Sequence, residues 1–292
     1  MSGTKRQAPV LAVINMKGGV GKTTLSGNLC REIFREHSAK TLLVDFDPQI
    51  NLSQLLLTRT QYDDLHKQGK TLWSIMESRA PESVFAVAES DLHDIGKVED
   101  YTTRLKYLTK TPDIDLHLLP GDFRLAILNL RENANSLKLA RKRFENLITK
   151  ARETFSLVVL DCNPSSSFLT RCAIESATHL LVPIRPDKYS VLGLEMLSEY
   201  VGQMTQLTKK PEFIVVFNGV GRTASSVETE LRAHGAFGPS VMVTSIPRSN
   251  VLHARADYTG FAVDRKVAYT GVIRTVLKSG AGELAKKLHL KK

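Results

Sequence analysis

Short apolar runs recur along the chain, and a longer segment with helical periodicity follows most of them. The runs are rich in Val, Ile and Leu and nearly continuous in hydrophobicity, as strands buried on both faces of a parallel sheet are. This pattern predicts strands at Val10–Ile14, Thr41–Asp45, Ile114–Leu119, Leu157–Asp161, His179–Ile184, Phe213–Phe217 and Val241–Ile246.

The segments between these strands have the spacing of amphipathic helices. Alternation of strand and helix predicts an α/β fold, with a mostly parallel twisted sheet and helices on both faces. In such sheets, ligands gather at the carboxyl ends of the strands. The predicted helices are Thr23–His37, Ser136–Glu153, Ser167–Ser176, Val191–Leu207 and Ser226–His234.

The stretch from Arg59 to Asp113 interrupts the alternation. It is polar, carries the only tryptophan, Trp73, and contains helical pieces at Leu72–Glu77 and Tyr101–Leu108. Because a loop of this length is uncommon in a compact domain, we expect a helical insertion. The sequence has no internal repeat or interdomain linker, so it predicts one domain over residues 1–292 with an insertion at about 59–113.

Composition limits the class of protein and its compartment. The net charge of +10 points to a polyanion or an anionic membrane surface as partner, although a merely solvated basic surface gives the same number. No apolar run reaches the ~20 residues that span a bilayer, and the first run is too short for a signal peptide. Three cysteines without metal-ligand spacing favour a reducing compartment, so we expect a cytoplasmic protein.

A glycine-rich loop stands between the first predicted strand and the first predicted helix. Its glycines let the backbone wrap round a polyphosphate, and the N–H groups at the start of the helix face the anion. Lys22 should neutralise the β- and γ-phosphates, and the Thr23 hydroxyl should ligate Mg²⁺. ATP and Mg²⁺ are therefore the predicted cofactors. The predicted nucleotide-binding residues of the loop are Lys17, Gly18, Gly19, Val20, Gly21, Lys22, Thr23 and Thr24.

Lys17 is a second lysine at the start of this loop. The pattern Lys-Gly-Gly-x-Gly-Lys-Thr resembles the signature of the ParA/MinD family of deviant Walker A P-loop ATPases. The resemblance implies a P-loop NTPase fold and an ATP-bound homodimer that hydrolyses ATP to ADP and phosphate. It further implies that Lys17 reaches the phosphates of the partner subunit, while Lys22 serves its own.

Further motifs of the family follow. The segment from Asp45 to Gln49 resembles switch I, where two carboxylates at a strand end can hold Mg²⁺ waters, although a solvated pair capping a strand is the alternative. The resemblance implies that Asp47 positions the attacking water and that Asp45 supports the metal shell. The Leu157–Asp161 strand resembles Walker B, with Asp161 accepting from Mg²⁺-bound water. Cys162 and the residue after it depart from the usual Asp-x-Pro-Pro.

Two shorter matches concern the adenine base of the nucleotide. Asn218 ends an apolar run similar to the strand that reads the adenine edge, and Pro247 lies in a loop similar to the one that covers it. The resemblance covers roughly residues 10 to 285, and residues 59–113 match it poorly.

Basic residues become dense late in the chain, and such side chains bind DNA phosphates without sequence preference. Among them, Arg255, Lys266 and Arg274 are the predicted DNA contacts. The overall resemblance is closest to ParA-type (Soj-like) partition ATPases without an N-terminal helix-turn-helix domain. It implies an ATP-dependent homodimer on nonspecific double-stranded DNA of the nucleoid. Slow hydrolysis, stimulated by a ParB-like or other cargo adaptor protein, would release it and so segregate plasmid or chromosome DNA or space a protein cargo.

Other members of the same family leave alternatives. A MinD-like ATPase would dock on membrane through a C-terminal amphipathic tail, here residues 282–292, but the tail lacks Phe or Trp anchors. A last helix packed on the domain has the same pattern, so we do not expect a membrane partner. An iron–sulfur carrier would need paired cysteines, and a metabolic kinase would need a substrate motif; the sequence presents neither.

Overall fold

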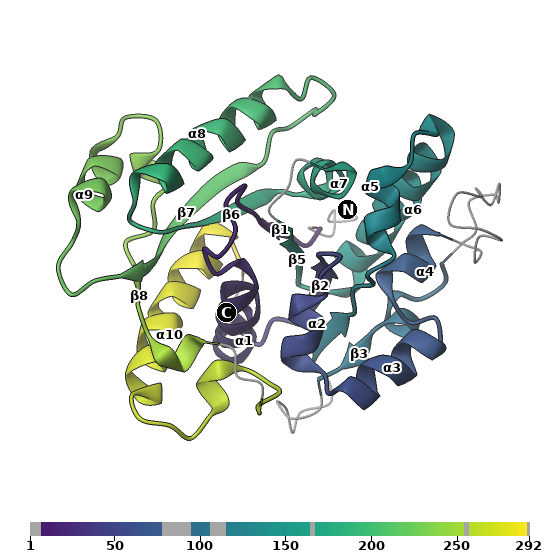
Figure 1. Ribbon diagram of the computed structural model, residues 1–292, viewed down its shortest axis with the longest axis horizontal. Helices are drawn as coiled ribbons and strands as arrows, with labels where there is room; N and C mark the ends of the chain where they lie inside the picture. The colour runs from purple at the N-terminus through teal and green to yellow at the C-terminus, as the bar shows by residue number, and fades with distance from the viewer. Residues whose placement is uncertain (1–6, 78–94, 106–114, 164–166, 254–256, 291–292) are drawn as a thin grey trace, which may run out of the picture.

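The computed structural model describes residues 7–77, 95–105, 115–163, 167–253 and 257–290. Eight strands form one sheet in the order β3-β4-β2-β5-β1-β6-β7-β8 (Figure 1). Every pairing is parallel except that of β3 with β4. The predicted mostly parallel α/β sheet is confirmed. The strands are β1 (Val10–Val13), β2 (Thr41–Phe46), β3 (Thr103–Arg104), β4 (Leu116–Leu119), β5 (Leu157–Cys162), β6 (His179–Ile184), β7 (Glu212–Val220) and β8 (Ile246–Pro247).

Helices cover both faces of the sheet, because alternate side chains of each buried strand point to opposite sides. Leu11 and Val13 face α1 (Lys22–His37), α2 (Asn51–Leu56), α3 (Arg59–Lys67) and α10 (Thr270–Lys287). Val10 and Ala12 face the other layer. That layer contains α4 (Leu72–Met76), α5 (Leu125–Leu130), α6 (Ala134–Thr154), α7 (Phe168–Ser176), α8 (Lys188–Gln203) and α9 (Ser226–Ala233).

Four short 3-10 helices complete the described elements. They are η1 (Val98–Tyr101), η2 (Gly238–Ser240), η3 (Asn250–Leu252) and η4 (Ala262–Asp264). Among the described residues, no helix is both long and apolar enough to cross a bilayer.

The predicted strand Val241–Ile246 is mostly wrong. Val241 forms one isolated bridge to β7, and only Ile246 belongs to a strand, β8. In between, the backbone N–H groups of Val243 and Thr244 donate to the Glu283 carboxylate of α10, at 2.7 and 3.0 Å. A helix side chain therefore takes the place of the sheet partner, and Val243 is left exposed.

The helix predicted over Tyr101–Leu108 is also wrong in its described part. Tyr101 ends η1, and the chain then pairs with β4 as β3, with the Leu105 N–H donating to the Leu116 carbonyl at 2.9 Å. Residues 106–108 lie outside the described residues, as do 78–94 and the rest of 106–114. The described part of the predicted insertion at 59–113 consists of α3, α4, η1 and β3.

The order of the strands brings the sequence motifs together at one edge of the sheet. β1 lies between β5 and β6, with β2 beyond β5 and β7 beyond β6. The loop after β1 therefore stands where the carboxyl ends of five parallel strands converge, which is the usual ligand position in an open α/β sheet.

Candidate nucleotide-binding site

Two glycines allow the loop between β1 and α1 to turn back on itself. Gly19 and Gly21 have φ angles of 72° and 92°, in the left-handed region that favours glycine. A β-carbon at Gly21 would also lie 2.2 Å from Nδ2 of Asn218, which donates a hydrogen bond to the Val20 carbonyl at 2.7 Å. Backbone conformation and close packing both therefore require glycine at position 21.

The N-terminus of α1 opens directly onto this loop. Its first turn carries no acidic side chain, and no side chain of the described residues caps it. The unpaired N–H groups and the positive end of the helix dipole are therefore left for another acceptor. Phosphate groups fit such a helix terminus.

The two lysines of the loop occupy different places. Lys22 is buried beneath the loop, where its Nζ donates to the carbonyls of Lys17 and Asn15 at 3.2 and 3.4 Å. Burial lowers the pKa of Lys22, and the nearby Asp161 and other acidic groups oppose this only in part. The Lys17 ammonium instead points outward to Asp187, with both carboxylate oxygens at 2.9 Å. Only one lysine therefore faces the interior of the site.

Asp161, at the end of β5, carries a buried carboxylate with one unsatisfied oxygen. Its Oδ1 accepts a hydrogen bond from the Ser26 hydroxyl at 2.7 Å, and its Oδ2 has no partner among the described residues. Burial raises the pKa of Asp161 to about 6, although hydrogen bonding by Ser26 and Thr23 favours the ionised form. An orphaned carboxylate oxygen beside a threonine hydroxyl fits a Mg²⁺ ion that keeps its waters and binds phosphates.

The carboxylate of Asp45 is bound by the helix that follows its strand. Its Oδ2 accepts from the N–H and the hydroxyl of Ser53, at 2.8 and 2.6 Å, and so fixes the first turns of α2. Burial, with the charge of Asp161 adding to it, raises the pKa of Asp45 to about 8. The structure thus brings Thr23 and Asp161 together, and Asp45, which is paired with Asp161 in the sheet, accepts hydrogen bonds from Ser53.

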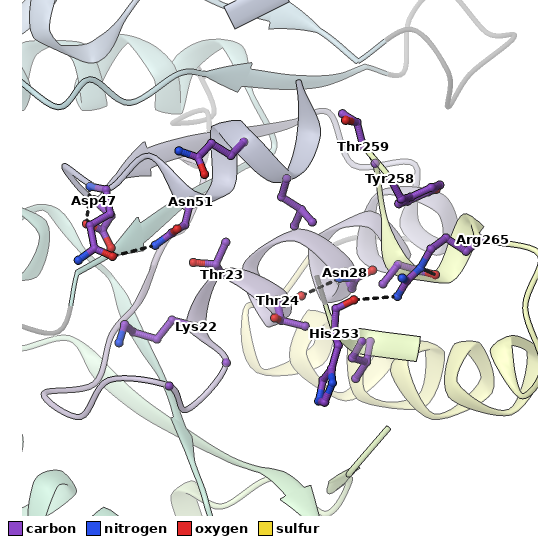
Figure 2. Close-up of a pocket in the computed structure, with 18 of the residues that line it drawn as sticks. Lys22, Thr23, Thr24, Asn28, Asp47, Asn51, His253, Tyr258, Thr259 and Arg265 are labelled. Atoms are coloured by element: carbon purple, nitrogen blue, oxygen red, sulfur yellow. Dashed lines mark hydrogen bonds between the residues drawn. The ribbon is translucent and has the colours of Figure 1, made fainter. Parts of the chain in front are cut away.

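Asp47 is the carboxylate of this segment that lines the cavity beside the loop (Figure 2). Its Oδ1 accepts from the backbone N–H of Gln49 at 2.9 Å. Burial raises the pKa of Asp47, and the Gln49 N–H and the Lys22 ammonium oppose the rise. The side chain is therefore positioned by its own turn and shares an electrostatic environment with Lys22.

Two cavities meet at the loop and share part of its lining. One, of about 740 Å³, extends from the loop between Asp47 and Asn51 on one side and Tyr258 and Arg265 on the other (Figure 2). The other, of about 440 Å³, lies over β7 and β8 and holds both residues predicted to contact adenine, Asn218 and Pro247. The residues that line both cavities are Gly19, Gly21, Thr24, Leu252 and His253.

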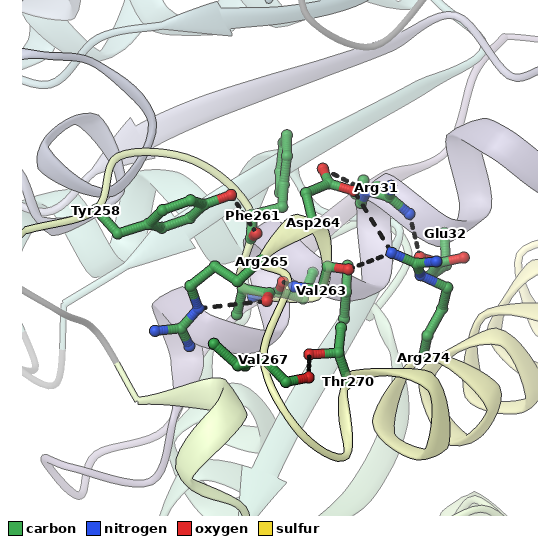
Figure 3. A network of polar contacts seen from close by, with 12 residues as sticks. Arg31, Glu32, Tyr258, Phe261, Val263, Asp264, Arg265, Val267, Thr270 and Arg274 are labelled. Carbon is green, nitrogen blue, oxygen red and sulfur yellow. Dashed lines mark hydrogen bonds and ion pairs between the residues drawn. The ribbon is translucent and has the colours of Figure 1, made fainter.

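The three residues predicted to contact DNA have different environments. Lys266 is exposed in the turn before α10. Arg274 is only partly exposed, because it donates to the Val263 carbonyl and lies 3.9 Å from Asp264 (Figure 3). Arg255 lies outside the described residues. Lys266 is therefore an exposed surface cation, whereas Arg274 also links α10 to η4.

Sequence reasoning did not identify three residues that shape this site. Ser26 follows Thr23 by one helical turn, so its spacing could have indicated a shared face of α1. Asn15 accepts from the Lys17 N–H at 2.8 Å and donates to the Pro183 carbonyl at 2.7 Å, which ties the loop to β6. Asp187 stands far from the loop in sequence, and no local pattern connects it with Lys17.

The sequence of the chain is similar to those of known proteins. A family model described as AAA domain matches residues 8–215. The chromosome-partitioning ATPase Soj of Treponema pallidum is 27% identical over 247 residues, which cover 82% of this chain and 83% of that protein. A ParA family protein of Chlamydia pneumoniae is 27% identical over 192 residues, or 65% of this chain, and the match spans 64% of that relative's length.

Solved structures show the same fold at low identity. A plasmid partition protein of Borrelia burgdorferi bound to AMPPNP has a TM-score of 0.68 and 16% identity, with 96% of this chain and 100% of that chain covered. A Cyanothece McdA variant in complex with ATP has a TM-score of 0.68 and 17% identity, with 98% of each chain covered. Cobyrinic acid a,c-diamide synthase of Mycobacterium smegmatis, with ADP and magnesium, has a TM-score of 0.68 and 20% identity, with coverage of 97% and 96%.

Proposed function

The chain belongs to the AAA domain family and to its ParA-type ATPases, and from this premise we propose that it is a ParA-like partition or positioning ATPase. The observation that carries the proposal is the placement of two lysines on one phosphate loop, Lys22 inside the site and Lys17 at its mouth. One cation would serve the nucleotide of its own subunit. The other, which is partly exposed, would reach the phosphates of a second subunit.

In the proposed reaction, the loop and Lys22 bind the phosphates of ATP, while Asn218 and Pro247 enclose the adenine. Thr23 and Asp161 would hold Mg²⁺, which neutralises charge that develops on the phosphates. Asp47 would orient the attacking water, because it is the switch carboxylate that lines the phosphate cavity. Asp45, which is held by hydrogen bonds from Ser53, would support the metal shell.

ATP binding would then close a homodimer in which Lys17 crosses to the partner's phosphates, and the closed dimer would bind nonspecific double-stranded DNA. The formal charge of +10 supports a polyanionic partner. A ParB-like or other adaptor protein would stimulate slow hydrolysis and so release the dimer. Such a cycle would operate in the cytoplasm, on the nucleoid.

The environment of the C-terminal helix favours this reading over membrane docking. Leu284 and Leu288, the apolar residues that a membrane-binding tail would expose, are buried and belong to the cluster that includes α1. An interfacial helix must instead present its apolar face to lipid.

DNA binding under defined nucleotide states tests the proposal. Binding to random-sequence duplex DNA would be measured with ATP, with ADP and without nucleotide, across a salt series. The wild type should bind only with ATP and lose affinity as salt rises. Lys17→Ala should abolish this binding, whereas the hydrolysis-impaired Asp47→Ala should retain it.

Absence of ATP-dependent DNA binding at low salt would overturn the proposal. Binding of the ATP state to anionic vesicles in place of DNA would then favour the membrane-cycling alternative. ATP binding by Lys17→Ala, measured by calorimetry, separates loss of the dimer from loss of the nucleotide.

A further inference from the structure

The ammonium of Lys17 is held by its own subunit. Its Nζ lies 2.9 Å from both carboxylate oxygens of Asp187 and 5.9 Å from the centre of the Tyr189 ring. The Lys17 N–H is fixed as well, by the Asn15 side chain at 2.8 Å. Both ends of the residue are thereby restrained against β6 and the start of α8.

Asp187 is itself fixed by the helix that it begins. It is the N-cap of α8, and its Oδ1 accepts from the Ser190 N–H at 2.9 Å. Its slight burial would raise the pKa of Asp187, but the bonds from Lys17 and Ser190 outweigh this and lower it. The carboxylate is therefore a fixed negative charge, and it does not line either cavity of the nucleotide site.

We propose that Asp187 is a positioning residue that keeps the Lys17 ammonium on its own subunit until a second copy of the chain binds. The inference rests on the proposed role of Lys17 across the dimer. Keeping the ion pair in the dimer would place the Asp187 carboxylate beside the partner's phosphates, and these negative groups repel each other. Dimer formation must therefore open the pair in each subunit.

The size of the effect follows from the exposure of the pair. The two side chains are 35% and 37% exposed, so the pair changes an equilibrium by a factor of roughly 1.5 to 5. Two such pairs open in each dimer. Loss of the pair should therefore lower the dimer dissociation constant by about 2-fold to 25-fold.

Two substitutions remove the charge of Asp187 and leave the helix cap in place, because Asn and Ser are both good N-cap residues. Dimerisation of wild type, Asp187→Asn and Asp187→Ser would be measured by sedimentation with Mg²⁺ and a non-hydrolysable ATP analogue. Both variants should dimerise at lower protein concentration than wild type. Glu36→Gln is the matched control, since it breaks an exposed ion pair with Lys278 at 3.0 Å, away from the loop.

Salt separates the charge effect from a structural one. Because salt screens exposed ion pairs, the difference between wild type and both Asp187 variants should shrink as the salt concentration rises. Variants that match wild type, dimerise more weakly, or differ from it equally at all salt concentrations would overturn this inference alone. A wild type that stays monomeric with the analogue would overturn the proposed function and the inference with it.

Discussion

The Ser26 hydroxyl helps to position the carboxylate of Asp161 beside the phosphate loop. Ser26 donates to Oδ1 of Asp161, and the other oxygen of that carboxylate is left without a partner among the described residues. Both Ser26 and Thr23 belong to α1, so one helix supplies the loop, the threonine and the support of the carboxylate. Residues that orient a ligand in this way contribute strongly to metal affinity.

We therefore expect Ser26→Ala to weaken Mg²⁺-dependent ATP binding by about 10-fold to 100-fold. The substitution removes the hydrogen bond from Ser26 to Oδ1 of the buried Asp161, so the carboxylate is less well oriented toward the metal ion. Calorimetric titration with and without Mg²⁺ measures it. An equal loss of affinity in both conditions would contradict the assigned role, and Ser136→Ala, on α6, is the control.

Two buried histidines make stability depend on pH. Burial lowers the pKa of His117 on β4 and of His179 on β6. As the pH falls through about 6.5, the unfolded chain takes up these protons before the folded one does, so each histidine makes the folded state less stable. The raised pKa values of Asp45 and Asp161 have the opposite effect on stability. They make the folded state more stable as the pH falls, because the folded state binds those protons more tightly.

A comparison with His117→Gln separates the contribution of His117 to this pH dependence from that of the two carboxylates. The free energy of unfolding of wild type, minus that of the variant, should fall as the pH is lowered from 7 to 5. Urea denaturation at a series of pH values measures this difference. A difference that stays constant over the range would show that His117 does not carry the effect.

At the scale of elements, α10 is part of the core. Leu277, Ala281 and Leu284 are fully buried in the cluster that contains α1, and Glu283 binds two backbone N–H groups before β8. Truncation at Glu283 would therefore remove core packing together with the tail. Point substitutions are the better probe of this helix.

Leu284→Ala should lower the free energy of unfolding by about 2–5 kcal/mol, because it deletes a fully buried side chain. Lys286→Gln, two residues on and exposed, should change it by less than about 0.5 kcal/mol. Urea denaturation compares the two. A small effect of Leu284→Ala would mean that α10 packs loosely enough to detach.

At the scale of the molecule, the basic residues late in the sequence do not share one environment. Lys266 is exposed, while Arg274 and Arg31 bind the segment before α10, with Arg31 paired to Asp264 at 3.0 Å (Figure 3). Substituting Arg274 would therefore disturb the fold and DNA binding together. Lys266 offers the cleaner test of a DNA surface.

Lys266→Ala should weaken ATP-dependent DNA binding and reduce the slope of log affinity against log salt by about 1 per subunit. Its melting temperature should match that of wild type. Lys142→Ala is the control, because Lys142 is exposed on α6, on the opposite face of the sheet. A larger loss with Lys142→Ala would move the DNA surface to that face.

Local sequence patterns predicted most of the sheet and the phosphate loop. β6 has the predicted bounds, and α1 begins one residue before its predicted start at Thr23. These elements were predictable because continuous apolar runs and a glycine loop followed by a helix are properties of neighbouring residues. The strand predicted at Val241–Ile246 was not, since Glu283 of α10 binds the backbone N–H groups that a sheet partner would have used.

The sequence by itself determined the α/β alternation and the chemistry of the loop, because hydrophobic period and glycine spacing act over a few residues. Only the tertiary structure decided which side chains meet. It bound Asp45 to Ser53, left an oxygen of Asp161 without a partner among the described residues, and joined Lys17 to Asp187 across 170 residues of sequence. These contacts depend on the order of the strands in the sheet. That order follows from burial and packing of the whole chain, which no local pattern contains.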